Sequence, residues 1–194
     1  MKIKDFNQLL TEVDSCTICE TNLKAGVRPV LQVNPHAKIL IAGQAPGSRV
    51  HATGIPFDDP SGDRLREWMG INKETFYDSQ KIAILPMAFC YPGKGKSGDL
   101  PPPPICAETW RNKLLETMPH IQLTLVIGQY ALAWHLKNRG KNLTETVKNW
   151  AMFGDQIMPL PHPSPRNNIW LKNNPWFEAD VLTVLQNRVH NILK

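Results

Sequence analysis

Residues 38–47, Lys-Ile-Leu-Ile-Ala-Gly-Gln-Ala-Pro-Gly, decide the fold of this chain. The first five predict a buried strand, because a short apolar run bounded by turn residues is typical of a parallel sheet. The next five predict a stiff loop. The same order recurs where the apolar run at residues 156–160 leads into a proline-rich loop at 162–167. Since ligands of open parallel sheets bind outside the carboxyl ends of the strands, we expect the two loops to face each other across a crevice.

Segments with strand and helix patterns alternate along the rest of the chain. Apolar runs predict four strands, at residues 38–42, 81–85, 123–127 and 156–160. Helical spacing of apolar residues predicts helices at 5–14, from a cap at Ser61 or Asp63 to near Gly70, and at 106–118, 129–136 and 176–193. The glycine- and proline-rich residues 91–104 predict a loop. We therefore expect an α/β fold over a single domain, residues 1–194. It would be a three-layer α/β/α sandwich around a mostly parallel four-stranded sheet.

Composition narrows the class of protein. With 194 residues, 42% hydrophobic and 20% charged, the chain has an ordinary globular size and balance. No apolar run is long enough to span a bilayer, and the amino terminus lacks the apolar core of a signal peptide. We therefore expect a cytoplasmic protein with no membrane partner, and a monomer. The net charge of +5 gives a mild attraction to polyanions, which is compatible with a nucleic-acid partner.

The four cysteines form two pairs that are far apart in sequence, Cys16 with Cys19 and Cys90 with Cys106. In a reducing compartment such a set more often supplies metal ligands or free thiols than a disulfide framework. Thiolates are soft ligands that select iron–sulfur clusters or zinc, and four of them complete either kind of centre. The spacing leaves three alternatives open: an iron–sulfur cluster, a structural zinc ion, or unligated thiols.

Taken in order, the motifs resemble those of one family. Gly43-Gln-Ala-Pro-Gly47, Gly54-Ile-Pro-Phe57, the four cysteines and His162-Pro-Ser-Pro165 resemble the uracil-DNA glycosylase superfamily, closest to its iron–sulfur branch. The resemblance spans most of the chain. It implies a [4Fe–4S] cluster on the four cysteines, DNA as the partner, and an enzyme of base-excision repair. That enzyme hydrolyses the N-glycosidic bond of a deaminated base, uracil above all.

The resemblance also implies roles for single residues. His162 would donate a hydrogen bond to the base oxygen on which charge develops, and Gln44 would position the attacking water. Phe57 resembles the aromatic residue on which a flipped base stacks. The remaining implied residues are Gly43, Ala45, Pro46 and Gly47 in the base pocket, and Ser164, Arg166 and Asn167 in contact with DNA. No lysine stands out as a Schiff-base nucleophile, so we expect hydrolysis without lyase chemistry.

Two positions depart from the family pattern. The iron–sulfur branch typically has glutamate at the position of Gln44, and an amide can hold a water but cannot accept its proton. Family members commonly carry an asparagine four residues before the third cysteine, where this chain has Pro86. Two alternatives therefore stand beside a uracil glycosylase. One is a nucleic-acid-binding relative with little or no excision, and the other is a glycosylase for another base.

Overall fold

The central sheet is the frame on which the rest of the chain is arranged. The computed structural model describes residues 3–194. Its sheet has the order β2-β1-β3-β4 and all three strand pairs are parallel. The strands are β1 (Ile39–Ala42), β2 (Ile82–Ile84), β3 (Leu123–Ile127) and β4 (Ile157–Leu160). The four predicted strands are confirmed, each within one or two residues of its expected ends.

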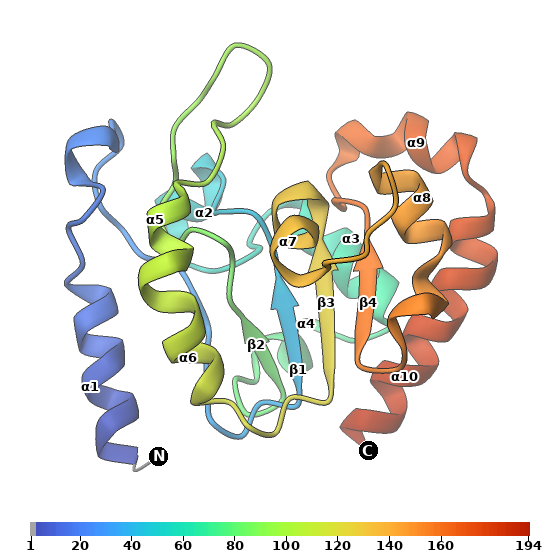
Figure 1. Ribbon diagram of the computed structural model, residues 1–194, viewed down its shortest axis with the longest axis horizontal. Coiled ribbons are helices and arrows are strands. Elements are labelled where there is room, and N and C mark those ends of the chain that lie inside the picture. The colour runs from blue at the N-terminus through green and yellow to red at the C-terminus, as the bar shows by residue number, and fades with distance from the viewer. Residues whose placement is uncertain (1–2) are drawn as a thin grey trace.

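Helices connect the strands and cover both faces of the sheet (Figure 1). The α-helices are α1 (Ile3–Asp14), α2 (Ser48–Thr53), α3 (Pro60–Met69), α4 (Lys73–Tyr77), α5 (Pro104–Cys106), α6 (Asn112–Glu116), α7 (Gly128–His135), α8 (Leu143–Lys148), α9 (Asn168–Asn173) and α10 (Thr183–Leu193). A π-helical segment, Ala107–Arg111, joins α5 to α6, and another, Phe177–Leu182, leads into α10. No helix within residues 3–194 is long and apolar enough to cross a bilayer.

The two faces of the sheet bury different helices because successive strand residues point to opposite sides. Ile39 and Ile41 of β1 lie in a core cluster with residues of α3, α4 and α10. Leu40 packs on the other face with residues of α1 and α6, and Ala42 packs there with residues of α7. The chain therefore forms the expected three-layer α/β/α sandwich.

Several local expectations are wrong. The cap of α3 is Asp59, whose Oδ1 accepts from the Gly62 amide at 2.9 Å, and neither Ser61 nor Asp63 caps the helix. Pro60 then occupies the first turn, where its missing N–H costs nothing. No helix was predicted between β1 and α3, where α2 lies. The expected loop at residues 91–104 holds one antiparallel bridge, between Lys94 and Asp99, and its last residue already begins α5.

A buried arginine ties the α5–α6 helix to the end of β2. Arg111 is fully buried, and its Nη1 donates to the carbonyls of Leu85 at 2.7 Å and Pro86 at 3.0 Å. Its Nη2 lies 2.7 Å from Nε2 of His135 in α7. Since a guanidinium only donates, His135 must accept at Nε2 and is neutral. Burial, assisted by the Arg111 charge, lowers the pKa of His135 to about 3.

We expect His135 to make the fold sensitive to acid. Its pKa rises from about 3 in the folded chain to the ordinary 6.5 on unfolding, so below pH 6.5 the unfolded state binds the extra proton. The resulting stability is complete above pH 6.5 and is lost toward pH 3, at up to about 1.4 kcal/mol per pH unit. Urea unfolding at pH 7.5 and pH 5 measures this loss.

The variant His135→Gln keeps an acceptor for Arg111 but cannot titrate. It should therefore lose less stability between pH 7.5 and pH 5 than the parent does. His190→Gln, at an exposed position of α10, should retain the parental pH dependence. An equal pH dependence in His135→Gln and the parent would show that His135 does not carry the effect.

Candidate active site

A cleft of about 680 Å³ lies at the carboxyl ends of the strands. This volume is within the range of pockets that enclose a small ligand. Three segments supply most of its lining, residues 43–50 after β1, residues 56–61 before and within α3, and the loop after β4. All ten residues predicted for catalysis, the base pocket or DNA contact line it: Gly43, Gln44, Ala45, Pro46, Gly47, Phe57, His162, Ser164, Arg166 and Asn167.

The first loop is held by backbone hydrogen bonds to the segment that follows β2. The Gly43 carbonyl accepts from the Met87 amide at 2.9 Å, and the Gln44 carbonyl accepts from the Ala88 amide at 3.0 Å. These bonds continue the parallel pairing of β1 with β2 beyond the ends of the strands. The loop therefore has a fixed course, and the half-buried Gln44 lines the cleft as it leaves the sheet.

Phe57 is held in a strained backbone conformation at the wall of the cleft. Its φ is +54°, a left-handed value that non-glycine residues rarely adopt. Gly62 makes room for it, because a Cβ at Gly62 would lie 1.8 Å from the Phe57 carbonyl oxygen. The Phe57 ring stacks edge-on against Phe76 at 6.2 Å, and a Cβ at Gly43 would lie 3.5 Å from its tip. Strain of this kind persists only where surrounding structure enforces it, and it clusters at functional sites.

The His162 side chain has a defined tautomer. The Ser164 amide donates to its Nδ1 at 3.2 Å, so in the neutral ring the proton sits on Nε2. Burial lowers the pKa of His162, and the nearby charges of Asp59 and Asp99 oppose that shift only in part. At neutral pH the side chain is therefore an uncharged donor through Nε2–H.

The rest of the histidine loop is braced from within and from α3. Asn167 Nδ2 donates to the His162 carbonyl at 2.7 Å, and the Ser164 hydroxyl accepts from the Arg166 amide at 3.3 Å. Arg64 of α3 donates to the Ser164 carbonyl at 3.1 Å. Asn167 and Ser164 thus shape the loop, whereas the Arg166 side chain is exposed. Of the three residues predicted to contact DNA, Arg166 is the one with a charged side chain, and that side chain is accessible to a phosphate.

The cleft also has lining residues that sequence reasoning missed. Asp59, Asp99 and Arg49 all line it, and the two aspartates lie close enough to His162 to influence its pKa. A signal for Asp59 existed, because aspartate directly before proline often begins a helix. Asp99 gave no local signal. It reaches the cleft because it lies against the first loop, where a Cβ at Gly47 would be 3.6 Å from Asp99 Oδ2.

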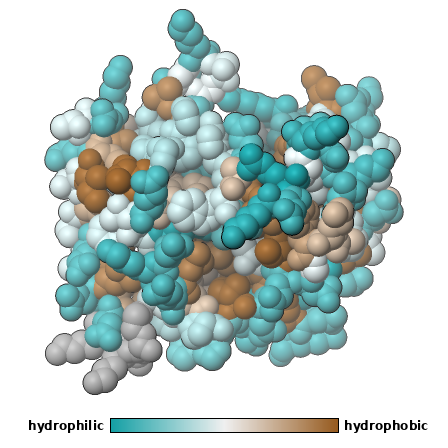
Figure 2. Space-filling model, viewed as in Figure 1, coloured by the Kyte–Doolittle hydropathy of each residue, from teal (hydrophilic) through white to brown (hydrophobic). Residues whose placement is uncertain are grey.

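Residues 91–103 project above the carboxyl end of the sheet as an extended arm (Figure 1). The bridge between Lys94 and Asp99 closes the arm into a hairpin. In the same view its tip is hydrophilic (Figure 2), and both Lys94 and Lys96 are exposed. The start of α1 and the end of α10 lie at the opposite end of the molecule (Figure 1).

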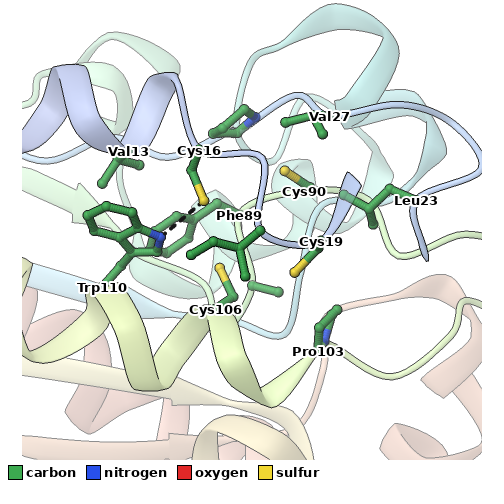
Figure 3. A pocket seen from close by; sticks show the side chains of 13 residues that line it. Val13, Cys16, Cys19, Leu23, Val27, Phe89, Cys90, Pro103, Cys106 and Trp110 are labelled. Atoms are coloured by element: carbon green, nitrogen blue, oxygen red, sulfur yellow. Dashed lines mark hydrogen bonds between the residues drawn. The ribbon is translucent and has the colours of Figure 1, made fainter. Parts of the chain in front are cut away.

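The four cysteines come together although three separate segments supply them. All four are free thiols and line one pocket with apolar neighbours such as Phe89 and Leu23 (Figure 3). Trp110 Nε1 donates to Cys16 Sγ at 3.3 Å. Burial, together with the smaller repulsion from the other three thiols, raises the pKa of Cys106 to about 12.

These thiols suit a centre that brings positive charge, which would relieve their mutual repulsion. Within residues 3–194 no three His, Cys, Asp or Glu side chains stand close enough to hold a metal ion as placed. Four thiols that converge on one pocket are a donor set that suits either a zinc ion or an iron–sulfur cluster.

One family model matches the chain. The model described as the uracil DNA glycosylase superfamily matches residues 31–186. The matched span contains every cleft residue predicted from the sequence, together with Cys90 and Cys106. Cys16 and Cys19 lie before it.

Proposed function

The chain belongs to the uracil DNA glycosylase superfamily, and on that premise we propose that it hydrolyses the N-glycosidic bond of uracil in DNA. Membership supports a glycosylase-type enzyme that acts on DNA. The choice of uracil, the residues that carry the reaction and the absence of lyase chemistry are our proposals. They would make the chain a monofunctional enzyme of base-excision repair.

The observation that carries the proposal is the neutral His162 in the wall of the cleft. Breaking the bond between sugar and base leaves negative charge on the base and positive charge on the sugar. A preorganised N–H aimed at the developing anion stabilises the transition state without having to reorganise. With Nδ1 engaged by the Ser164 amide, the Nε2–H of His162 is free to donate to a uracil carbonyl oxygen.

The other cleft residues have complementary roles in the proposal. A base inside the duplex is out of reach, so the nucleotide would flip into the cleft, where its ring would stack on Phe57. Gln44 would hold a water near the sugar, and Gly43, Ala45, Pro46 and Gly47 would let the backbone approach closely. Arg166 and the arm lysines Lys94 and Lys96 would bind phosphates, which makes affinity fall as salt rises. No lysine in the described part of the chain lines the cleft, which supports hydrolysis without a Schiff base.

We also propose that Cys16, Cys19, Cys90 and Cys106 hold a [4Fe–4S] cluster. Glycosidic hydrolysis transfers no electrons, so the role of such a cluster would be structural. Cys90 precedes the arm and Cys106 follows it, and a shared centre would hold the base of the arm to the segment after α1. Zinc remains the alternative to be tested.

Base release from defined oligonucleotides tests the proposed function. Anaerobically purified protein is incubated with single- and double-stranded DNA carrying uracil, hypoxanthine or xanthine, and free base is measured by chromatography. We expect release of uracil. Release of a different base would support a DNA glycosylase but would contradict the choice of uracil as its substrate.

A second candidate is a DNA-binding protein that has lost excision. Gln44 and Pro86 favour it, because an amide cannot take a proton from water and Pro86 offers no side-chain hydrogen bond to a base. The Pro86 carbonyl already accepts from Arg111. Binding to the same oligonucleotides without release of any base would establish this candidate and contradict the first.

A further inference from the structure

The first loop lacks a group that can accept a proton. Hydrolysis is faster when a positioned base removes a proton from the attacking water, typically by 10²- to 10⁴-fold. Gln44 cannot do this, and in the described part of the chain the acids that line the cleft are Asp59 and Asp99. We propose that Asp99, which the arm holds against the first loop, is the general base of the reaction. This inference rests on the proposed function.

Asp99 is fixed against the first loop. A Cβ built on Gly47 would lie 3.6 Å from Asp99 Oδ2, so the carboxylate faces the loop that carries Gln44. The Tyr91 hydroxyl donates to the other oxygen, Oδ1, at 3.3 Å. Tyr91 is buried, and it therefore anchors the carboxylate to the core while leaving Oδ2 toward the cleft.

Backbone hydrogen bonds within the arm fix the position of Asp99 beside the first loop. The Leu100 amide donates to the Gly93 carbonyl at 2.8 Å, and the Gly95 amide donates to the Gly98 carbonyl at 2.7 Å. On the side of the histidine loop, a Cβ at Gly98 would lie 3.1 Å from Arg166 Nη1. The arm thus meets both loops of the cleft. The influence of Asp99 on the pKa of His162 agrees with a carboxylate that faces the same space.

Asp59 is the weaker choice because it already has a structural task. Its Oδ1 accepts from the Gly62 amide and caps α3. Asp99 is not the cap residue of a helix, although it lies beside Gly47, the N-cap of the short helix α2. The two aspartates can be separated experimentally, since asparagine caps a helix about as well as aspartate does.

The proposed step balances as follows. The bond between C1′ and the base nitrogen breaks, and its electron pair leaves with the base, whose negative charge is met by His162 Nε2–H. The water oxygen bonds to C1′ while Asp99 Oδ2 takes one of the water protons. That proton then passes to solvent, and the released base anion takes up a proton from solvent.

Single-turnover release of uracil from a single-stranded oligonucleotide tests Asp99. We expect Asp99→Asn to lower the rate by at least about 100-fold. DNA affinity should stay within about threefold of the parent or improve, because a negative charge near phosphate is removed. Asp99 is exposed, so the thermal unfolding midpoint should be unchanged. Asp99→Ser, measured in parallel, should show the same loss of rate.

Two further variants give the test its specificity. Asp59→Asn should keep its rate within about tenfold of the parent, which is less than the loss of a general base. The double variant with Gln44→Glu and Asp99→Asn should react at least about tenfold faster than Asp99→Asn alone, because it returns a carboxylate to the adjacent loop. An Asp99→Asn rate within threefold of an active parent, or a large loss in Asp59→Asn instead, would overturn Asp99 and leave the proposed function standing. A parent that releases no base would overturn both.

Discussion

Replacing His162 by alanine is expected to lower the rate of base release by about 10²- to 10³-fold, the usual cost of one preorganised donor at a developing anion. The expectation follows from the hydrogen bond between the Ser164 amide and Nδ1, which leaves Nε2–H as the donor. The effect should appear in the single-turnover rate and not in DNA affinity, since the donor acts mainly on charge that develops in the transition state.

The control for this variant is His190→Ala. His190 is exposed on α10, in the carboxyl-terminal part of the chain and outside the cleft lining, so its loss should leave the rate unchanged. His162→Gln places an amide donor on a side chain of similar reach and should retain part of the rate. A His162→Ala rate within threefold of the parent would show that the base anion is stabilised by another group.

The second large effect concerns the four cysteines. Anaerobically purified protein should be brown and should contain iron and sulfide in near-equal amounts, about four of each per chain. Cys106→Ser should lose the metal and about 4 kcal/mol or more of unfolding free energy, the stabilisation from a ligand at 1,000 times its Kd. Iron content, sulfide content and chemical unfolding of the two proteins measure these changes.

The matched control is Ile105→Ser, which makes the same replacement one residue earlier. The Ile105 side chain is 43% exposed, so this variant should keep the parental iron content. Colourless protein that contains stoichiometric zinc would show that the four cysteines form a zinc site and not a cluster. Metal-free protein, with Cys106→Ser as stable as the parent, would show that the thiols ligate nothing.

The main architecture could be predicted because its signals are local. All four residues of β1 are buried, and the sequence of a strand that is covered on both faces is a continuous apolar run. The loop that follows β1 carries glycine and proline, and the loop that follows β4 carries proline, so their positions beyond the sheet could be inferred. Because parallel strands end at one edge, the shared cleft could be inferred as well.

The missed helices are too short to show a helical period. α2 has six residues and buries only Val50, so no apolar stripe marks it. α4 and α8 carried a different signal, since Asn72 and Asn142 cap them through their side chains. Asn142 followed three residues later by Glu145 is a helix start that could have been found.

Long-range placement could not be predicted at all. Asp99 lies in a glycine-rich stretch, and no nearby residue indicates that its side chain lies against Gly47. Arg111 has the pattern of an ordinary helical arginine, yet its helix turns it into the core to hold the carbonyls of Leu85 and Pro86. Such placements depend on packing between elements that are distant in the chain.

The most direct test of the account weighs both products of the reaction. The parent is incubated with an oligonucleotide that carries a single uracil, and the products are weighed by mass spectrometry. The account predicts free uracil and an unbroken abasic strand, whose mass is that of the substrate minus uracil plus one water. No free uracil, or a strand cleaved at the abasic site, would contradict the claim that this chain is a monofunctional uracil-DNA glycosylase.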